Sequence, residues 1–408
     1  MRVLLIGGGG REHALGWKLA RSSRVDELIS MPGNPGLAEL GPTVEGIGVT
    51  DIGAIAAMAR VQDVDLVVVG PEAPLAAGAA DAIGALGIPV FGPTRAAARL
   101  ESSKAFAKKI MEKAGVATGE HWVFTSPGPA KMHLDKMDAP FVVKADGLAG
   151  GKGVLVTDDR EDAMVWVDYC FEGGFGNAGE SVLIEEFLDG PELSVFAVCT
   201  ESGAVPLEPA RDFKRLKDGD EGPNTGGMGS YSPVDALPDG LIGEVMSGVI
   251  KPTLDQMSQE GTPFTGFLYA GLVLTQEGPK VLEYNVRLGD PETQAVLPRM
   301  ENDLLDVLEG AEAKWSETAT VNVVLAAEGY PTEPKKGAPI RGLNQVADDV
   351  LVFHAGTRKE DGKLVVDGGR VLNLVGQGDT IASARDRAYE AVESVAWKGS
   401  QYRTDIAR

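Results

Sequence analysis

Cysteine, basic residues and long apolar runs are all scarce in this sequence. Cys170 and Cys199 are the only cysteines among 408 residues, too few for a disulfide framework or a thiolate zinc site, so free thiols in a reducing compartment are expected over a single bridge. Lys and Arg total 38 against 60 Asp and Glu, and the net charge of −22 repels a phosphodiester backbone, which argues against a nucleic-acid partner. No run reaches the roughly 18 apolar residues of a membrane span, and residues 3–6 are too short for a signal peptide, so we expect a cytoplasmic protein without a membrane partner.

The composition is otherwise that of a globular protein, with 43% hydrophobic and 24% charged residues, and the length predicts roughly two to four domains. In residues 1–101, short apolar segments alternate with helical patterns, and each segment ends in a glycine- or proline-rich turn: 3–6, 28–31, 65–69 and 88–91. This alternation predicts a parallel α/β domain whose ligand-binding loops lie at the carboxyl ends of its strands.

The pattern changes after residue 101. Residues 102–114 predict a capped amphipathic helix with Phe106, Ile110 and Met111 facing inward. Strands joined by glycine loops then predict an α+β region with mainly antiparallel pairing, at 141–144, 153–157, 182–187, 192–199, 267–275 and 280–286. Residues 330–343 indicate a connector before a final unit with strands at 350–353 and 370–375 and a helix at 380–395. We therefore predict domains at 1–101, 102–325 and 326–408.

The first glycine cluster, Gly7–Gly10, follows the first strand and precedes a helix. A dinucleotide fingerprint fails here, because Glu12 or His13 takes the place of its third glycine and the second strand ends without an acidic residue. Glycines before a helix still expose backbone N–H groups, so Gly9 and Gly10 are predicted to bind an anion. A purely structural turn is the alternative.

The second glycine cluster, at 147–153, lies between two predicted strands and so cannot be a P-loop, which leads into a helix. A strand–loop–strand arrangement predicts a flexible flap that closes over a triphosphate, with Gly150, Gly151, Lys152 and Gly153 as donors. Lys144 ends the strand before the flap. Lys104 lies in the first turn of a helix, where a cation is unfavourable by about 0.3–1 kcal/mol, which points to an anionic partner. Each lysine alone would be an ordinary surface residue; together with the flap they are predicted phosphate ligands.

The apolar strand at 182–188 turns abruptly acidic. A hinge strand of this kind can offer backbone groups to an adenine edge and carboxylates to ribose hydroxyls, which would involve Glu185, Glu186, Leu188 and Glu192. An edge strand with solvated charges is an equally weighted alternative.

The strongest signal is Glu283-Tyr284-Asn285-Val286-Arg287, followed by Leu-Gly-Asp-Pro-Glu. The two-residue strand period places Glu283, Asn285 and Arg287 on one face. Carboxylate and amide oxygens suit magnesium, and a guanidinium can hold a carboxylate or phosphate bidentately. Glu283 and Asn285 are therefore the predicted metal ligands.

Two polar stretches, 210–215 and 223–230, complete the candidate site. Arg211 and Lys214 could hold an acyl phosphate or a ribose phosphate, while Thr225, Gly226 and Gly227 allow a ligand to approach the backbone closely. A long surface loop is the alternative.

The order of these features resembles the ATP-grasp fold: a helix-borne Lys104, a strand-end Lys144, a glycine flap, an acidic hinge and a Glu-x-Asn strand. The segment Arg287–Gln294 resembles the signature of the glycinamide ribonucleotide synthetase (phosphoribosylamine–glycine ligase) family. Further stretches resemble it too: 7–13, 32–36, 70–74, 144–153, 224–233 and 353–357. The resemblance implies an α/β preATP-grasp domain, an ATP-grasp core with a mobile lid at about 118–190, and a small C-terminal α+β domain.

The resemblance also implies a reaction, in which ATP, glycine and 5-phosphoribosylamine give glycinamide ribonucleotide, ADP and phosphate in purine biosynthesis. Lys144, Arg287 and Asp290 are the expected catalytic residues, with Arg287 and Asp290 on the carboxylate and ammonium of glycine. The ribose phosphate is assigned to Gly9, Gly10, Asn34, Pro35 and Gly36. Mg²⁺ or Mn²⁺ is the expected ion; the number of ions stays open, because residues 267–275 lack the further acid that many ATP-grasp proteins carry.

No essential nucleophile is expected, because holding two reactants together can supply effective molarities of about 10⁵–10⁸ M without a covalent enzyme intermediate. A monomer is also expected. Another ATP-grasp carboxylate–amine ligase is the nearest alternative. A non-catalytic nucleotide-binding regulator is the alternative from a different class, and an NAD-dependent dehydrogenase is a distant third.

Overall fold

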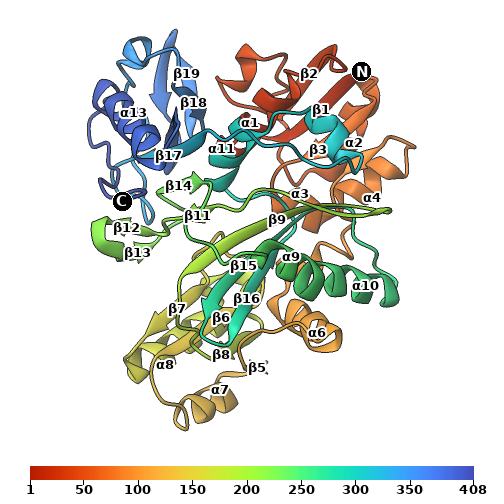
Figure 1. Cartoon of the computed structure of the whole chain (residues 1–408). Coiled ribbons are helices and arrows are strands. Elements are labelled where there is room, and N and C mark those ends of the chain that lie inside the picture. Colours follow the sequence, from red (N-terminus) through yellow and green to blue (C-terminus); the bar gives the residue numbers. More distant parts are fainter.

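The N-terminal part is a parallel sheet, as predicted, and its strand order is β2-β1-β3-β4 (Figure 1). The computed structural model describes the backbone of residues 1–408 and every side chain except that of residue 177. The strands are β1 (Arg2–Gly7), β2 (Glu27–Pro32), β3 (Leu66–Val69) and β4 (Val90–Phe91), and the helices are α1 (Gly10–Leu19), α2 (Ile52–Val61), α3 (Glu72–Ala77) and α4 (Ala79–Gly84). Because Val3–Ile6 are fully buried, both faces of β1 are covered, as a central parallel strand requires.

Two short helices, α5 (Arg99–Ser102) and α6 (Lys104–Ala114), follow the first sheet. The helix predicted from Ser102 begins later, because Ser103 is the cap: its hydroxyl accepts from Phe106 N at 3.1 Å. Ile110 and Met111 are buried as predicted, whereas Phe106 is only partly buried at the edge of the core.

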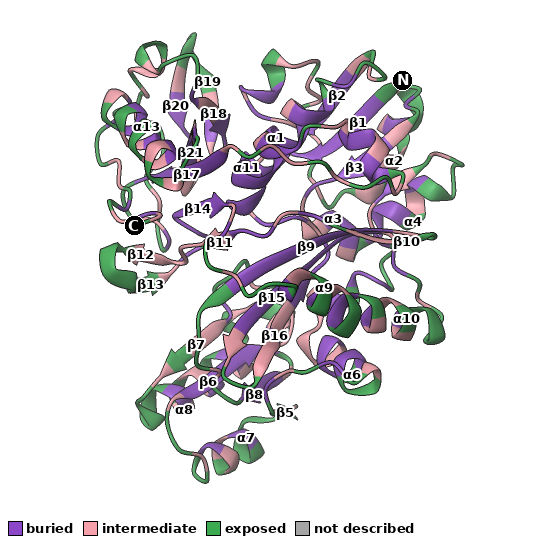
Figure 2. Ribbon diagram, viewed as in Figure 1, coloured by how far each residue is buried: buried purple, intermediate pink, exposed green. Residues whose placement is uncertain are grey.

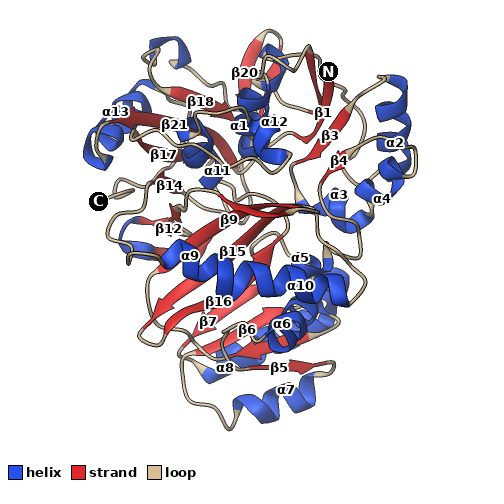
Figure 3. Ribbon diagram, turned by 45° about the vertical axis from the view of Figure 1, so that its right-hand side comes forward, coloured by secondary structure: helices blue, strands red, loops and turns tan.

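The central sheet is antiparallel, in the order β10-β9-β15-β16. Its strands are β9 (Glu192–Thr200), β10 (Gly203–Pro206), β15 (Gly266–Thr275) and β16 (Gly278–Asn285), and the helices nearby are α9 (Leu241–Val245) and α10 (Lys251–Gln259). Figure 3 shows these helices lying alongside the sheet. One apolar cluster joins the parallel sheet, α6, α10 and one face of the central sheet, so the two units pack as one body.

A smaller antiparallel sheet, β5-β8-β6-β7, lies at the far end of the molecule (Figure 1). It consists of β5 (His121–Phe124), β6 (Phe141–Ala145), β7 (Val154–Thr157) and β8 (Val182–Glu185), with α7 (Pro127–Leu134) and α8 (Arg160–Tyr169) on one face. All of these elements fall within the segment 118–190. The strand predicted to run to Phe187 ends at Glu185, where the chain leaves the sheet toward β9.

The last sheet is β11-β14-β17-β21-β18, and it combines strands from the middle and the end of the chain. Its strands are β11 (Arg211–Asp212), β14 (Gly229–Ser232), β17 (Ala319–Ala326), β18 (Leu351–His354) and β21 (Arg370–Gly378), and α13 (Ile381–Ser394) packs on it. Two hairpins, β12–β13 (Arg215–Lys217, Glu221–Asn224) and β19–β20 (Thr357–Glu360, Lys363–Val366), and two helices, α11 (Glu292–Val296) and α12 (Leu304–Leu308), complete the chain. Most residues of β9, β15 and β17 are buried, whereas those of β12 and β13 are exposed or partly buried (Figure 2). No described helix is both long and apolar enough to cross a membrane.

Candidate active site

The three side chains of the Glu-x-Asn-x-Arg motif lie together. Asn285 Nδ2 is 3.5 Å from Glu283 Oε1, and Arg287 donates to Asn285 Oδ1 at 3.0 Å. The strand β16 ends at Asn285, so Arg287 reaches this position from the loop and not from the strand predicted to run through residue 286. Glu283 pairs in register with Gly271 of β15, which pairs with Ser194 of β9. The absence of a side chain at Gly271 leaves Glu283 room beside the middle of the sheet.

Three lysines surround Glu283. Burial would raise the pKa of Glu283, but Lys214, Lys144 and Lys104 hold it below its usual value, so the carboxylate is anionic at neutral pH. Within the described residues no three His, Cys, Asp or Glu side chains form a metal site. The carboxylate of Glu283 and the amide oxygen of Asn285 are donors that suit a hard divalent cation, which would take its other ligands from phosphate oxygens and water.

Arg287 is held by two carboxylates that the sequence analysis did not identify. Its guanidinium donates to Glu101 Oε1 at 2.8 Å, to Glu72 Oε2 at 3.2 Å and to Leu288 O at 3.2 Å. Glu101 also accepts from Val286 N at 2.8 Å. The structure thus gives Arg287 a set of internal partners, so a substrate carboxylate would have to share the guanidinium with them. Glu72 follows the Gly70-Pro71 turn at the carboxyl end of β3, and this position in the sequence could have marked it as a candidate site residue.

Lys144 belongs to a buried ion cluster. Its ammonium is 3.0 Å from Glu185 Oε2, and Lys108 of α6 is 2.8 Å from the same oxygen. All three side chains are at most 6% exposed, and Glu185 Oε1 is a buried oxygen without a hydrogen-bond partner among the described residues. The carboxylate of Glu185 thus faces lysines and not solvent, and its backbone is paired within the sheet with His121 of β5 and Val142 of β6. Lys108 was missed because a lysine on an amphipathic helix is ordinarily a surface residue.

The glycine flap lies between β6 and β7, as predicted. Gly150 and Gly151 have φ values of +58° and +77°, and Lys152 is exposed, whereas Gly153 is buried. Lys104 donates to Gly147 O at 3.3 Å, and the Cβ position of Gly151 is 3.8 Å from Thr225 O. The flap therefore lies beside Lys104 and the Thr225–Gly227 turn.

The predicted hinge residues join the two antiparallel sheets. Glu186 exchanges backbone and side-chain hydrogen bonds with Glu120, at 2.8 Å from Glu186 N and 3.0 Å to Glu186 Oε2. Glu192 begins β9 and forms an ion pair with Lys214. Leu188 lies between them and is half-buried.

A second charged cluster surrounds β11. Arg211 Nε is buried and has no hydrogen-bond partner among the described residues, which is the state expected of a side chain that awaits an anionic ligand. Burial raises the pKa of its neighbour Asp212 to about 7, and Glu292 acts in the same direction while Lys214 opposes it. Ser194 contacts both Tyr269 Oη at 2.8 Å and Glu292 Oε1 at 3.2 Å. Asp212, Ser194 and Tyr269 were not predicted; Glu292 lies in the motif but was given no role.

The first glycine loop is occupied by protein groups. Gly9 N donates to Glu12 Oε2 at 2.8 Å, and the Cβ position of Gly9 lies 3.5 Å from Asp290 Oδ2. Asn34 Nδ2 donates to Gly8 O at 3.0 Å and to His354 O at 2.8 Å, and Asn34 Oδ1 accepts from Gly36 N and Leu37 N. Asn34 therefore uses its whole amide within the fold, and the N–H group of Gly9 already has a carboxylate partner.

Asp290 connects three parts of the chain. Its carboxylate accepts from Gln294 Nε2 at 2.7 Å and lies 3.3 Å from the guanidinium of Arg370, which also donates to Gly226 O and Asp290 O. Burial would raise the pKa of Asp290, but Arg370 and Arg11 hold it down. Arg370 was not predicted, since it belongs to a strand of the last sheet with no recognisable motif.

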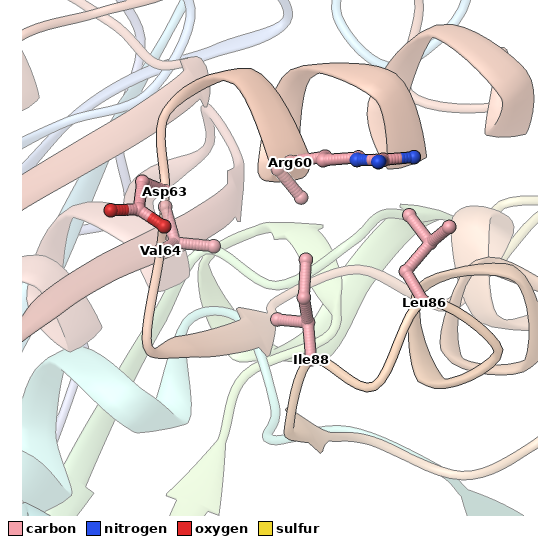
Figure 4. Close-up of a pocket in the computed structure, with 6 residues that line it drawn as sticks. Arg60, Asp63, Val64, Leu86 and Ile88 are labelled. Carbon is pink, nitrogen blue, oxygen red and sulfur yellow. The ribbon is translucent and has the colours of Figure 1, made fainter.

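The parallel sheet also carries a hollow at its other edge (Figure 4). It lies before the amino ends of β3 and β4, opposite the ligand-binding edge of such sheets. Its lining is Ala59, Arg60, Asp63, Val64, Leu86 and Ile88.

The parallel sheet, the two antiparallel sheets and the flap facing an acidic strand end together define an ATP-grasp protein. The family models for phosphoribosylglycinamide synthetase match in three parts: the N domain at residues 1–101, the ATP-grasp (A) domain at 102–293 and the C domain at 320–408. The chain belongs to the phosphoribosylglycinamide synthetase family.

Individual relatives agree with that assignment. The chain is 48% identical over 416 residues to the phosphoribosylamine–glycine ligase of Brucella melitensis, covering 100% of this chain and 97% of the relative. The crystal structure of the phosphoribosylamine–glycine ligase of Thermotoga maritima matches with a TM-score of 0.88 at 37% identity, covering 100% of both chains. A biotin carboxylase from Campylobacter jejuni, solved as a β,γ-ATP complex, matches with a TM-score of 0.75 over 98% of this chain and 92% of that one, but at 15% identity it shares the fold alone.

Proposed function

We propose that this chain catalyses the ATP-dependent ligation of glycine to 5-phosphoribosylamine, with a glycyl phosphate as the intermediate. The reaction yields glycinamide ribonucleotide, ADP and phosphate, and it belongs to purine biosynthesis. The observation that carries the proposal is the joint position of Glu283, Asn285 and Arg287 beside three lysines, in a chain that matches the family over its whole length.

The nucleotide is assigned to the space between the two antiparallel sheets. The hinge residues that follow Glu185, from Glu186 to Leu188, offer backbone groups to adenine, and Glu192 offers a carboxylate to the ribose. Lys144, Lys104 and the flap donate to the phosphates. Glu283 and Asn285 would hold Mg²⁺ or Mn²⁺, which when bound would neutralise phosphate oxygens and draw electrons from the γ-phosphorus.

Glycine enters as a carboxylate that attacks the γ-phosphate, and ADP leaves. Lys104, Lys144 and Lys152 supply positive charge where negative charge develops, in a site that excludes water. The flap closes over the glycyl phosphate and limits its hydrolysis. The amine of 5-phosphoribosylamine then attacks the acyl carbon and phosphate departs, so the enzyme itself forms no covalent bond.

Arg287 and Asp290 remain the proposed contacts for glycine. Each already has partners within the protein, so glycine would share them with these groups. Arg211 is the proposed anion ligand with the best support, because its buried Nε has no partner in the part of the chain that is described. Lys214 and the turn at Thr225, Gly226 and Gly227 border the same space, and we assign the ribose phosphate or the acyl phosphate to them. The loops at Gly9, Gly10, Asn34, Pro35 and Gly36 would act chiefly through backbone groups that remain free.

The proposal is tested by incubating the purified chain with ATP, Mg²⁺, radiolabelled glycine and 5-phosphoribosylamine. Labelled glycinamide ribonucleotide and ADP should form together, and omission of either substrate should stop product formation. Glu283→Ala should remove activity while leaving the fold intact. Phosphate release that does not depend on glycine, or that requires bicarbonate, would point to another ATP-grasp ligase. A wild-type chain that binds ATP but turns over no substrate would point to a regulator. A monomeric state and a cytoplasmic location stay predictions.

A further inference from the structure

A short segment near the end of the chain, Arg403–Asp405, grips a hairpin that borders the candidate site. We call this segment the clamp. Arg403 is only 1% exposed, and it donates to Asp220 Oδ1 at 2.6 Å and to Arg215 O at 3.2 Å. Asp405 accepts from Gly219 N at 2.8 Å, and Thr404 binds both carboxylate oxygens of Asp218. The clamp therefore contacts one strand and the whole tip of the β12–β13 hairpin.

The hairpin has little else to hold it. Its two strands pair only at Arg215–Asn224 and Lys217–Glu221, with a register shift between them, and residues 217–223 are exposed. An isolated two-stranded hairpin is marginally stable at best in water. Within the hairpin, Arg215 Nη1 also donates to Gly222 O at 2.8 Å. The hydrogen bonds that join the tip residues Asp218, Gly219 and Asp220 to described residues outside the hairpin all go to the clamp.

The clamp is itself held by hydrogen bonds to the helix α13 and by the core of the last sheet. Tyr389 of α13 donates to Arg403 O at 2.8 Å and accepts from Ile406 N at 3.1 Å. Ile406 is fully buried in the core of the last sheet. Asp405 makes two hydrogen bonds with Arg403, each 2.7 Å, and these bonds lower the pKa of Asp405 to about 2, so the pair stays charged at neutral pH.

The base of the hairpin carries the residues that border the site. Thr225 donates through both its N–H and its hydroxyl to Lys214 O, each at 2.8 Å, and Lys214 pairs with Glu192. Phe213 exchanges backbone bonds with Met228 and Gly229, and its ring lies 5.0 Å from the guanidinium of Arg403. Arg403 thus contacts both neighbours of Lys214 in the chain, namely Phe213 and Arg215.

We propose that Arg403–Asp405 is a positioning clamp that holds the β12–β13 hairpin. Through the hairpin it keeps Lys214 and the Thr225–Gly227 turn in place beside Glu283 and the glycine flap. This inference rests on the proposed function for the identity of the substrates. The clamp residues do not touch the reacting groups. They act through the hairpin on the acceptor side of the site and not on the hinge that is assigned to adenine.

The test uses the double variant Asp218→Ala/Asp220→Asn, which removes two acidic partners of the clamp from the hairpin tip; the side chain of Asp220 is 70% exposed, so the core is untouched. The KM for glycine or 5-phosphoribosylamine should rise about tenfold, and the KM for ATP should rise by a smaller factor, because Lys214 also pairs with Glu192. The melting temperature should change little. Trypsin should cut after Lys217 faster in Arg403→Ala than in the wild type, because this variant weakens the clamp and leaves the residues around the Lys217–Asp218 bond unchanged. Arg403→Lys, which keeps the charge but cannot bridge two carboxylates, should give a smaller effect than Arg403→Ala.

The matched control is Asp349→Asn, which removes a half-exposed acid paired with Arg387 at 3.5 Å in the same terminal unit. It should leave kinetics and trypsin cleavage unchanged. Wild-type kinetics in the double variant, or an equal rise in the KM for ATP, would overturn the clamp. Trypsin cleavage reports on the hairpin without any substrate, so a wild-type chain that fails to use glycine would refute the proposed function and not the clamp.

Discussion

Two glycine-rich loops border the candidate site, and an added Cβ atom would meet very different surroundings in each. In the first loop, the Cβ position of Gly8 lies 2.4 Å from Gly33 O, and that of Gly10 lies 2.4 Å from Asn373 Nδ2. In the flap, no described atom lies within 4 Å of the Cβ position of Gly150, and Gly151 approaches only Thr225 O, at 3.8 Å. Gly8 and Gly10 thus need to be glycine because neighbouring chain fills the space, whereas Gly150 and Gly151 in the middle of the flap need it because their φ values are positive. The ends of the flap are packed: the Cβ position of Gly147 lies 2.8 Å from Ala178, and that of Gly153 lies 2.7 Å from Ala149.

This difference indicates two structural roles: the first loop is a joint, meaning a packed contact between parts of the chain, and the flap is a ligand-binding loop. The first loop is packed against Asn373, Gln294 and Glu12, which come from the last sheet, from α11 and from α1. It therefore fixes how the parallel sheet meets the rest of the chain. The flap is exposed on one side and carries Lys152 toward open space, so its donors are available to a nucleotide. Glycine content alone does not distinguish these two uses.

The largest effect is expected from the flap. Lys152→Ala removes one charged donor from the predicted phosphate site, and loss of one such donor typically lowers kcat by about 10²–10³. The melting temperature should stay the same, because Lys152 is exposed. Steady-state kinetics and thermal unfolding measure the two quantities. Lys136→Ala, also an exposed lysine of the small-sheet unit, is the control and should keep full activity; equal activity in both variants would remove the flap from the mechanism.

The next effect concerns the packed loop. Gly10→Ala places a methyl group against Asn373 and Gln294, at 2.4 Å and 2.7 Å, and overpacking of this kind costs about 1–3 kcal/mol of the free energy of unfolding. Urea unfolding should show the loss, whereas the KM for ATP of the folded protein should not change. Gly53→Ala in the helix α2, where the nearest atom is 4.0 Å away, is the matched substitution and should be neutral or stabilising. A stable Gly10→Ala variant with a raised KM for ATP would reverse the two roles.

Local patterns were sufficient to predict most strands and the centre of the site. Glu283 and Asn285 are two residues apart on one strand, so the strand period alone brings them together, and the flap lies between two strands that are neighbours in the chain. The parallel sheet followed from four apolar segments with turn residues at their ends. The limits of elements were less certain, as at Ser103 and Glu185, because caps and the last hydrogen bonds depend on single contacts.

Contacts between distant segments could not be predicted from the sequence. Arg370 reaches Asp290 across 80 positions, and Glu101 reaches Arg287 across 186. No periodicity links such pairs, and each residue taken alone has the appearance of a surface charge. The internal partners of Arg287 and Asp290, which change the weight of their predicted roles, became visible only with the fold.

Low pH should lower the free energy of unfolding through two buried histidines, His13 and His354, beside the first glycine loop, and not through the flap. Burial lowers the pKa of His13 to about 3 and that of His354 to about 4, and His13 Nδ1 accepts from His354 N at 2.8 Å. Since the folded-state pKa values are depressed, the unfolded chain binds more protons below pH 6.5, and stability falls as the pH drops toward these values. Between pH 6.5 and 5.5, His13→Gln should lose about 1 kcal/mol less than the wild type, by urea unfolding at each pH. Parallel pH profiles would show that His13 is not neutral and buried in the native state.

The smallest effect is expected for Gly151→Ala. The residue has φ +77°, and a left-handed conformation costs an L-residue roughly 1–2 kcal/mol if it must be kept. The surrounding space is open, so the flap can relax and the free energy of unfolding should fall by less than about 1 kcal/mol. The relaxed flap would hold its N–H groups less well, and the KM for ATP should rise severalfold with kcat affected less.

Gly219→Ala is the control for this last substitution, because that glycine also has a positive φ, +69°, and open space around its Cβ position, but it lies at the hairpin tip away from the assigned nucleotide site. It should leave the KM for ATP unchanged. If both variants raised that KM alike, backbone strain anywhere near the site would be enough to weaken ATP binding. The result would then give no evidence that the flap binds the phosphates. If Gly151→Ala instead unfolded as readily as Gly10→Ala, the flap would be a packed element, and the distinction between the two loops would be lost.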